Sequence, residues 1–467
     1  MKMNRVNRNY WLAAVLMIAL GVMPAGVSAQ SKRDVEQTYV LNQPYETVKL
    51  KAPKGKKVKN VILMIGDGMS LMHVYSAWTA NRGKLNLDNA MAVGLSKTYC
   101  LDKLTTDSGA GGTALATGQK TIYHAVGVDA KGNPLTTLVD VAKETNRSAG
   151  VVVTCRLNDA TPADFCCHNI DRDEAEAITV DYLNCGADFV FGGGSKYFEN
   201  RTDGRNLFNE LQGKGYQVLR SWDELAKAKG GKLFTVTDSL DLPVPAQRGD
   251  ILAKASLKAI EVLNQNKKGF FLMVEGGRID HALHDTNAKR ALQDTVAFDN
   301  ALKAAIDQMK SLDPDLKNTL IVVTADHDHT LVLNGYAKRT GKTTDSEAGV
   351  LGVVKNYAGT AIGQPATDAN SMPYSIIGFG NGENRTQSSR AAMASLDETV
   401  TSANTYHQEA VIRTSAGNET HGGTDVFLGA IGKGSETFLG TIDNTKVFGL
   451  VKTAAGLYST TNTETIT

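Results

Sequence analysis

The sequence predicts an α/β protein with three layers, α/β/α, built around a large and mostly parallel sheet. Short apolar runs recur along the chain, each followed by glycine or an acidic residue, and helix-length stretches separate them. Continuous hydrophobicity is typical of strands buried on both faces, and long connections are typical of parallel strands joined by helices. The runs that support this prediction are residues 61–65, 149–154, 189–191, 270–274 and 320–323.

The composition is that of a folded protein and excludes several classes. The chain has 467 residues, of which 42% are hydrophobic and 21% charged. These fractions exclude a disordered, fibrous or coiled-coil protein. Since 50 Lys and Arg nearly balance 49 Asp and Glu, the formal net charge is +1, which gives no support to a nucleic-acid partner.

The first 29 residues have the pattern of a secretory signal peptide. Lys2, Arg5 and Arg8 precede an apolar stretch at 11–23, and a Val-Ser-Ala sequence ends at Ala29. The alternative is an uncleaved membrane anchor, but the apolar stretch is short for a span of about 20 residues. We therefore expect cleavage after Ala29, no stable membrane anchor afterwards, and a periplasmic or secreted protein.

Residues 30–467 are predicted to form one domain. Between 330 and 420 the pattern weakens into polar sequence, in which only 374–379 resembles a strand. This stretch is too long for a plain loop, so we expect a less regular insertion or subdomain near the site.

Five cysteines lie in one part of the chain, and export permits disulfide bonds between them. An odd number leaves at least one unpaired within a single chain, and the sequence does not assign the pairs. The cysteines are Cys100, Cys155, Cys166, Cys167 and Cys185.

Three acidic residues stand just after predicted strands, at Asp67, Glu275 and Asp326. In open α/β sheets, ligands bind outside the carboxyl ends of the strands. Three such acids, far apart in sequence, predict carboxylates that converge on one site.

Histidine and acidic residues combine in patterns typical of metal ligands. Asp280 and His284 are four residues apart, which puts them on one face of a helix, while Asp326 and His327 are adjacent at a strand end. His421 lies beside two glycines. Mixed histidine and carboxylate ligands suit zinc, whereas an all-oxygen set suits magnesium. Four of the nine histidines fall in these two acid-rich segments: His281, His284, His327 and His329.

Ser108 is followed by a run of small residues that resembles a tightly packed helix start. A serine there lies at the positive end of the helix dipole, which favours an anion or alkoxide. The alternative is a serine that only caps the helix. The chain has no GxSxG motif, so the sequence does not indicate a catalytic triad. A zinc ion is then the natural activator of the hydroxyl.

A third group comprises Asp159, Thr161 and Arg172. Thr161 can offer a neutral oxygen to magnesium, and Arg172 can form paired hydrogen bonds with a tetrahedral anion. The alternative for Arg172 is a surface ion pair with the acids next to it in sequence.

Taken together and in this order, the motifs resemble those of the zinc- and magnesium-dependent alkaline phosphatases. The resemblance spans residues 60–432 and is weakest at 330–420. It rests on Gly66-Asp67-Gly68-Met69, Asp107-Ser108, Asp159-Ala160-Thr161-Pro162, Glu275-Gly276 with Asp280 and His284, Thr324-Ala325-Asp326-His327, and His421-Gly422.

The resemblance implies a role for each of these residues and two Zn²⁺ and one Mg²⁺ per subunit. Ser108 would be the nucleophile and Arg172 the phosphate clamp. One zinc would take Asp280, His284 and His421, and the other Asp326, His327 and Asp67. Magnesium would take Asp67, Thr161 and Glu275, with Asp159 close by through water.

The implied reaction is hydrolysis of small phosphate monoesters through a phosphoserine, by a homodimer. One position departs from the best-known pattern. Bacterial relatives pair Asp at the Asp159 position with Lys at the His281 position, and animal relatives have His at both. We expect Asp159 and His281 to assist substrate binding, His281 through water, the alternative being that His281 draws zinc into the magnesium site.

Two further alternatives remain at this point. Other enzymes of the same superfamily, such as a phosphodiesterase or phosphomutase, would use similar metals, whereas a sulfatase needs a Cys/Ser-x-Pro-x-Arg segment that the chain lacks. An exported phosphate- or metal-binding protein without turnover would have no need of Ser108.

Overall fold

The computed structural model describes residues 57–457 except 82, 338–348, 357–359, 362 and 385–394. The chain divides into two units, 1–52 and 53–467, and every described residue belongs to the second. The predicted signal peptide, residues 1–29, lies outside the described residues. Within the described part, no helix has the length and apolar character needed to cross a membrane.

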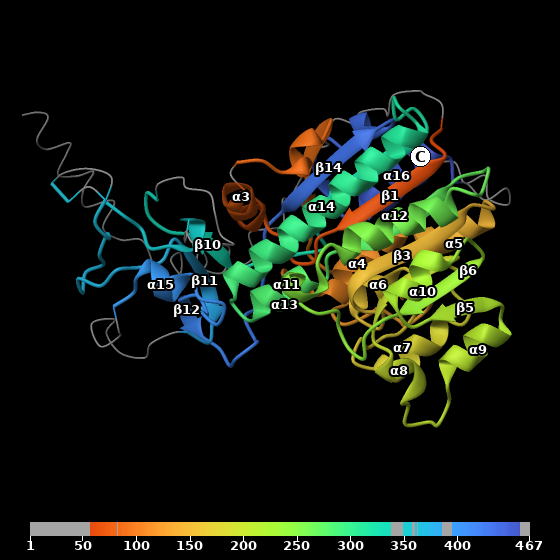
Figure 1. Ribbon diagram of the computed structural model, residues 1–467, viewed down its shortest axis with the longest axis horizontal. Coiled ribbons are helices and arrows are strands. Elements are labelled where there is room, and N and C mark those ends of the chain that lie inside the picture. Colours follow the sequence, from red (N-terminus) through yellow and green to blue (C-terminus); the bar gives the residue numbers. More distant parts are fainter. Residues whose placement is uncertain are drawn as a thin grey trace, which may run out of the picture. The chain divides into compact units, whose positions relative to one another are not determined.

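A ten-stranded sheet forms the centre of the described unit (Figure 1). Only β14 runs antiparallel to its neighbours, which confirms the predicted α/β fold with a mostly parallel sheet. In order across the sheet, the strands are β15 (Gly440–Asp443), β2 (Ala92–Lys97), β14 (Val426–Gly432), β8 (Thr319–Thr324), β1 (Asn60–Ile65), β7 (Phe270–Glu275), β3 (Ser148–Arg156), β4 (Phe189–Gly193), β6 (Lys232–Val236) and β5 (Tyr216–Leu219).

Helices cover both faces of the sheet, because successive strand residues point to opposite sides. In β1, Ile62 and Met64 join one buried core, while Val61, Leu63 and Ile65 join the other. The first core includes residues of α3 (Leu71–Ala80), α10 (Trp222–Lys227), α12 (Ile251–Leu263), α13 (Arg278–His284) and α14 (Ala288–Leu312). The second includes residues of α4 (Ser108–Thr117), α5 (Leu138–Glu144), α6 (Ala160–Asp164), α7 (Ala175–Asp181), α8 (Lys196–Glu199), α9 (Leu207–Gly213) and α16 (Thr445–Ala455).

Part of the predicted insertion at 330–420 lies outside the described residues, and its described part contains a small separate sheet. Strand β11 begins at Ile377, three residues later than the apolar run at 374–379 indicates. The sheet order is β10 (Leu331–Leu333), β11 (Ile377–Gly382) and β12 (Ala410–Arg413), and a two-stranded pair joins β9 (Asp328–His329) to β13 (His421–Gly422). Two further short helices are α11 (Pro245–Arg248) and α15 (Glu398–Thr401).

All five cysteines are described, and all five are free thiols. The structure therefore shows no disulfide bond among these five cysteines, although export would permit one. A hydrogen bond with Cys185, and then burial, raises the pKa of the Cys166 thiol well above its usual value, so these two side chains are neighbours.

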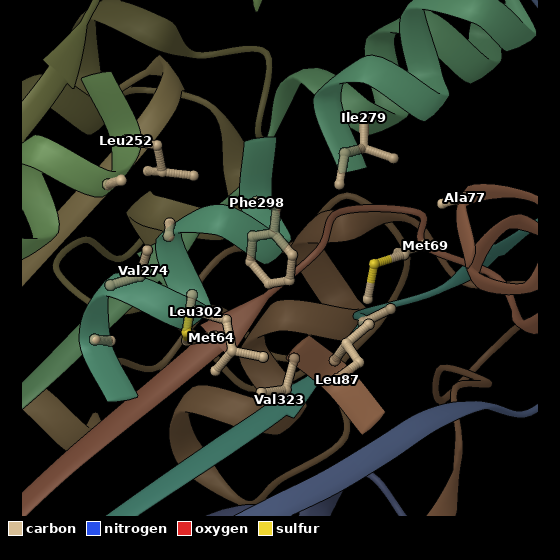
Figure 2. Packing of buried hydrophobic residues seen from close by; sticks show 14 of the residues in the cluster. Met64, Met69, Ala77, Leu87, Leu252, Val274, Ile279, Phe298, Leu302 and Val323 are labelled. Carbon is tan, nitrogen blue, oxygen red and sulfur yellow. The ribbon is translucent and has the colours of Figure 1, made fainter. Parts of the chain in front are cut away.

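Phe298 is fully buried in the first core, and Figure 2 shows it among Met64, Val274 and Leu302. Replacing Phe298 by Ala is expected to lower the free energy of unfolding by about 3–5 kcal/mol, because the surrounding helices and strands collapse only partly into the cavity. Urea unfolding measures the loss. Val411→Ala, at a side chain 70% exposed, is the control and is expected to change stability by less than about 0.5 kcal/mol. Equal losses in both variants would contradict this packing.

Candidate active site and metal centre

Four neighbouring strands bring the predicted strand-end acids together. Strands β8, β1, β7 and β3 are adjacent and parallel, so their carboxyl ends meet at one edge of the sheet. Glu275 ends β7, while Asp67, Asp159 and Asp326 follow β1, β3 and β8 by two or three residues. The strand order therefore produces the convergence that the sequence pattern predicts.

Asp67, Asp326 and His327 form a buried group whose ligand atoms all lie within 4.8 Å of one another. Nε2 of His327 is 3.2 Å from Asp67 Oδ1 and 3.4 Å from Asp326 Oδ2. The Thr161 hydroxyl lies 3.5 Å from Asp67 Oδ2 and 3.4 Å from Asp326 Oδ2. We call Asp67, Asp326 and His327 the Asp326 group.

A close turn of the chain shapes the Asp326 group. The backbone N–H of Gly68 donates to Asp326 Oδ1 at 3.1 Å. Gly68 has a φ of +64°, and a Cβ there would lie 2.4 Å from the ring of His329. Glycine is required at this position for both reasons.

Asp280, His284 and His421 form a second group, here called the Asp280 group. Helix α13 places Asp280 and His284 on one face, as their spacing predicts. His284 Nε2 lies 3.3 Å from Asp280 Oδ1 and 3.1 Å from His421 Nε2, and His421 Nε2 lies 3.6 Å from Asp280 Oδ1.

The Nδ1 atoms of both histidines are engaged outside this group. His421 Nδ1 donates to the main-chain oxygen of Thr106 at 2.8 Å, and His284 Nδ1 donates to that of Glu419. The Nε2 atoms are thereby left as acceptors that face each other and Asp280, which is the tautomer a metal ligand needs.

Ser108 is the first residue of α4 and lies beside the Asp326 group. Its hydroxyl oxygen is 3.2 Å from His327 Nε2, and the residue is 2% exposed. The helix cap is Asp107, which accepts hydrogen bonds from the N–H groups of Gly109 and Ala110. The capping alternative for Ser108 is therefore wrong, and its hydroxyl faces the Asp326 group.

Arg172 pairs with acids distant in sequence rather than with its neighbours. Its guanidinium donates to Asp107 Oδ2 at 3.0 Å and to Asp159 Oδ1 at 3.1 Å. Although burial alone would lower the pKa of Arg172, these two carboxylates raise it, so the side chain is a permanent cation. Arg172 thus links the start of α4, through Asp107, to the carboxyl edge of the sheet, through Asp159.

Asp159 is surrounded by fixed positive charge. Arg156 lies 3.3 Å from it, and His281 Nε2 donates to its Oδ2 at 3.1 Å. Burial alone would raise the pKa of Asp159, but Arg156, His281 and Arg172 hold it far below its usual value. Arg278 donates to His281 Nδ1 at 2.7 Å, so both ring nitrogens of His281 are already engaged.

Asp67 and Glu275 lack such partners. Burial, and then repulsion from the surrounding carboxylates, raises the pKa of both groups well above their usual values. Oε1 of Glu275 is buried without a hydrogen-bond partner. Buried carboxylates need a compensating cation, and this mixture of carboxylate, hydroxyl and imidazole donors fits divalent metal ions.

Two further residues complete the site without a predicted role. His329 contacts Asp280 Oδ1 through Nε2 at 2.7 Å and Glu419 Oε2 through Nδ1 at 2.5 Å. Burial alone would lower the pKa of His329, but these carboxylates raise it to about 10. His329 belongs to the acid-rich segments noted above, since it follows His327 by two residues. Glu419 has no signal in the sequence beyond its place two residues before His421.

The alkaline phosphatase family model matches residues 58–457. The chain belongs to the alkaline phosphatase family. Its members are phosphomonoester hydrolases, so the protein is an enzyme of that class and the resemblance noted in the sequence is confirmed.

Relatives and solved structures agree with this assignment. Alkaline phosphatase 4 of Bacillus subtilis (strain 168) is 36% identical over 327 residues, which are 66% of this chain and 68% of the relative. The alkaline phosphatase of Gadus morhua is 30% identical over 441 residues, covering 80% of this chain and 87% of its own.

The structure of alkaline phosphatase from the Antarctic bacterium TAB5 is similar, with a TM-score of 0.67 and 27% identity, and the match covers 86% of this chain and 100% of that one. A variant of that enzyme, in which aspartate replaces a histidine, has Mg bound in its M3 site and matches with a TM-score of 0.65 and 28% identity, over 86% and 99% of the two chains.

Restoring divalent ions to chelator-treated protein is expected to raise its stability, because cations relieve the repulsion between Asp67 and Glu275. The gain at each site is about 2.7 kcal/mol when the free ion is a hundredfold above its Kd. Unfolding in urea with and without zinc and magnesium measures it. Glu275→Gln should reduce the gain from magnesium, whereas Glu199→Gln, at an ion pair with Arg220, should not. Unchanged midpoints with both ions would contradict the metal fit.

Proposed function

We propose that this enzyme hydrolyses small phosphate monoesters to an alcohol and inorganic phosphate through a phosphoserine at Ser108. The observation that supports this most directly is the position of the Ser108 hydroxyl. It lies at the N-terminus of α4, 3.2 Å from His327 Nε2 and beside a buried group of metal-ligand side chains. A serine oxygen in that position has the positive end of a helix behind it and, in front of it, side chains that fit a divalent cation.

The proposed cofactors are two Zn²⁺ and one Mg²⁺ per subunit. The Asp326 group, with Asp67 as a shared ligand, would hold one zinc and the Asp280 group the other. The all-oxygen set Asp67, Thr161 and Glu275 would hold magnesium, with Asp159 nearby. Bound at these positions, the ions would lower the pKa of the serine hydroxyl and of water and stabilise the attacking and leaving oxygens.

Arg172 supplies the remaining positive charge. It lies between Asp107, next to Ser108, and Asp159, and its N–H groups form a rigid fork that matches two oxygens of a tetrahedral anion. The two carboxylates restrict its rotamers before substrate arrives, which lowers the entropy lost on binding.

His281 fits an assisting role better than a ligand role. Its Nδ1 accepts from Arg278 and its Nε2 donates to Asp159, which leaves no ring nitrogen for a metal ion. In this proposal His281 and Asp159 keep the Arg172 side of the site ordered, and substrate meets them through water.

The alcohol part of the ester has a place to lie. A cavity of about 650 Å³ opens beside His284 and His421 of the Asp280 group. Its walls include Lys103, Thr105 and Tyr123. An ester bound at Ser108 can direct its leaving oxygen toward the Asp280 group and its alcohol into this cavity.

The predicted leader and the family support a periplasmic or secreted enzyme that works as a homodimer. Both statements belong to this proposal, and subcellular fractionation and size-exclusion chromatography of the mature chain test them.

Ser108→Ala is expected to lower monoesterase activity by at least about a thousandfold, because only direct attack by water remains. The measurement is hydrolysis of p-nitrophenyl phosphate, together with trapping of phosphoserine at low pH. Ser221→Ala, at the cap of α10, is the control and should keep full activity. Full activity in Ser108→Ala would overturn the proposed mechanism, and faster hydrolysis of bis-p-nitrophenyl phosphate by wild type would favour a phosphodiesterase.

Arg172→Ala is expected to lower kcat/KM for p-nitrophenyl phosphate by about 10- to 100-fold, because charge-assisted hydrogen bonds contribute roughly 1.5–3 kcal/mol. Arg172→Lys should recover only part of the loss, since lysine keeps the charge but not the planar fork. Steady-state kinetics with metal content held equal measures both. Wild-type kcat/KM in Arg172→Ala would exclude the clamp.

A further inference from the structure

Glu419 lies at the centre of the contacts around the Asp280 group, although it is not one of its members. It precedes β13, which carries His421, and is 1% exposed. All three of its oxygen atoms, the main-chain oxygen and both carboxylate oxygens, accept hydrogen bonds from other segments. A buried glutamate with this many partners holds distant segments in fixed relation.

The main-chain oxygen of Glu419 fixes His284. It accepts the Nδ1–H of that imidazole, and in return the Glu419 N–H donates to the main-chain oxygen of His284 at 3.2 Å. These two contacts tie the end of α13 to the segment before His421. They also orient His284 so that Nε2 faces Asp280 and His421.

The carboxylate of Glu419 acts on Asp280 through His329. Oε2 accepts from His329 Nδ1 at 2.5 Å, and His329 Nε2 donates to Asp280 Oδ1 at 2.7 Å. Oε1 is occupied by the N–H and the hydroxyl of Thr330, the former at 2.9 Å. The carboxylate therefore cannot rotate without losing a contact, and the imidazole between the two acids is held at both nitrogens.

We propose that Glu419 is the positioning residue of the Asp280 group, orienting His284 through its main chain and Asp280 through its carboxylate and His329. This inference rests on the proposed function, in which the Asp280 group holds one zinc. In this proposal Glu419 is not itself a ligand, because its two carboxylate oxygens are engaged by His329 and Thr330. Glu419 determines how well the ligand atoms of the Asp280 group are oriented, and therefore how slowly the zinc ion dissociates from it.

The Asp326 group provides an internal comparison. Neither its carboxylates nor His327 contacts Glu419, and its orientation comes from Gly68, Thr161 and its own main chain. Loss of the Glu419 carboxylate contact should therefore weaken the zinc site of the Asp280 group directly, and affect the other site less, because it is linked to Glu419 only through Asp280, His329 and Gly68.

Glu419→Gln separates this role from a general structural one. The glutamine retains the main-chain contacts with His284, and its amide oxygen can still accept from Thr330. An amide has one acceptor oxygen where the carboxylate has two, so the glutamine cannot accept from Thr330 and from His329 Nδ1–H at once, and the fixed link to Asp280 is weakened. Glu383→Gln is the matched control, because Glu383 forms a similar pair with His407 Nδ1 at 2.8 Å outside the metal-ligand groups.

The test is the rate at which zinc-loaded protein releases its two zinc ions to a chromogenic chelator, with metal content checked by mass spectrometry. In Glu419→Gln, one ion is expected to leave at least about 10-fold faster than in wild type while the rate of the other changes several-fold less, since groups that orient metal ligands affect affinity by about 10- to 100-fold. Glu383→Gln should release both ions at wild-type rates.

Two results would overturn the inference while leaving the proposed function intact. One is wild-type release of both ions from Glu419→Gln. The other is equal acceleration of both ions together with a lower unfolding midpoint of the metal-free protein, which is the signature of a structural role. A wild-type protein that holds no zinc would instead overturn both proposals, so the two failures are distinguishable.

Discussion

The structure depends on a group of buried carboxylates at one edge of a parallel sheet. Strand β1 lies between β8 and β7, and β3 follows β7, so Asp326, Asp67, Glu275 and Asp159 emerge side by side. Burial, and then repulsion between these like charges, raises the pKa of Asp67 and Glu275 well above their usual values. The surroundings of this edge consist largely of groups that compensate that repulsion.

Two kinds of positive charge can compensate these buried carboxylates: arginine side chains of the protein, and metal ions. Asp159 is neutralised by cations that belong to the protein, chiefly Arg156 and Arg172. Asp67 and Glu275 have no such cation, and this is where the donor set fits metal ions. Fixed arginines hold Asp159 in place, while Asp67 and Glu275 have no cation of the protein beside them and are open to ligands that can exchange.

Close packing brings Ser108, the proposed nucleophile, to this edge. Helix α4 approaches so tightly that a Cβ at Gly111 would lie 2.7 Å from the main-chain oxygen of Asp326. With glycine there, the start of the helix can bring Ser108 within 3.2 Å of His327. The run of small residues after Ser108 is thus a requirement of this approach rather than of the helix alone, since glycine inside a helix is destabilising.

The sequence by itself determined the features that depend on neighbours along the chain. Continuous apolar runs ending in acids predicted the strands and the side of the sheet on which Asp67, Glu275 and Asp326 stand, and a spacing of four placed Asp280 and His284 on one helix face. Local periodicity encodes these features directly. The tertiary structure alone decided which strands are adjacent, which carboxylates pair with Arg172, and that Glu419 reaches Asp280 through His329. Those outcomes depend on hydrogen bonds between residues tens to hundreds of positions apart, which no local pattern encodes.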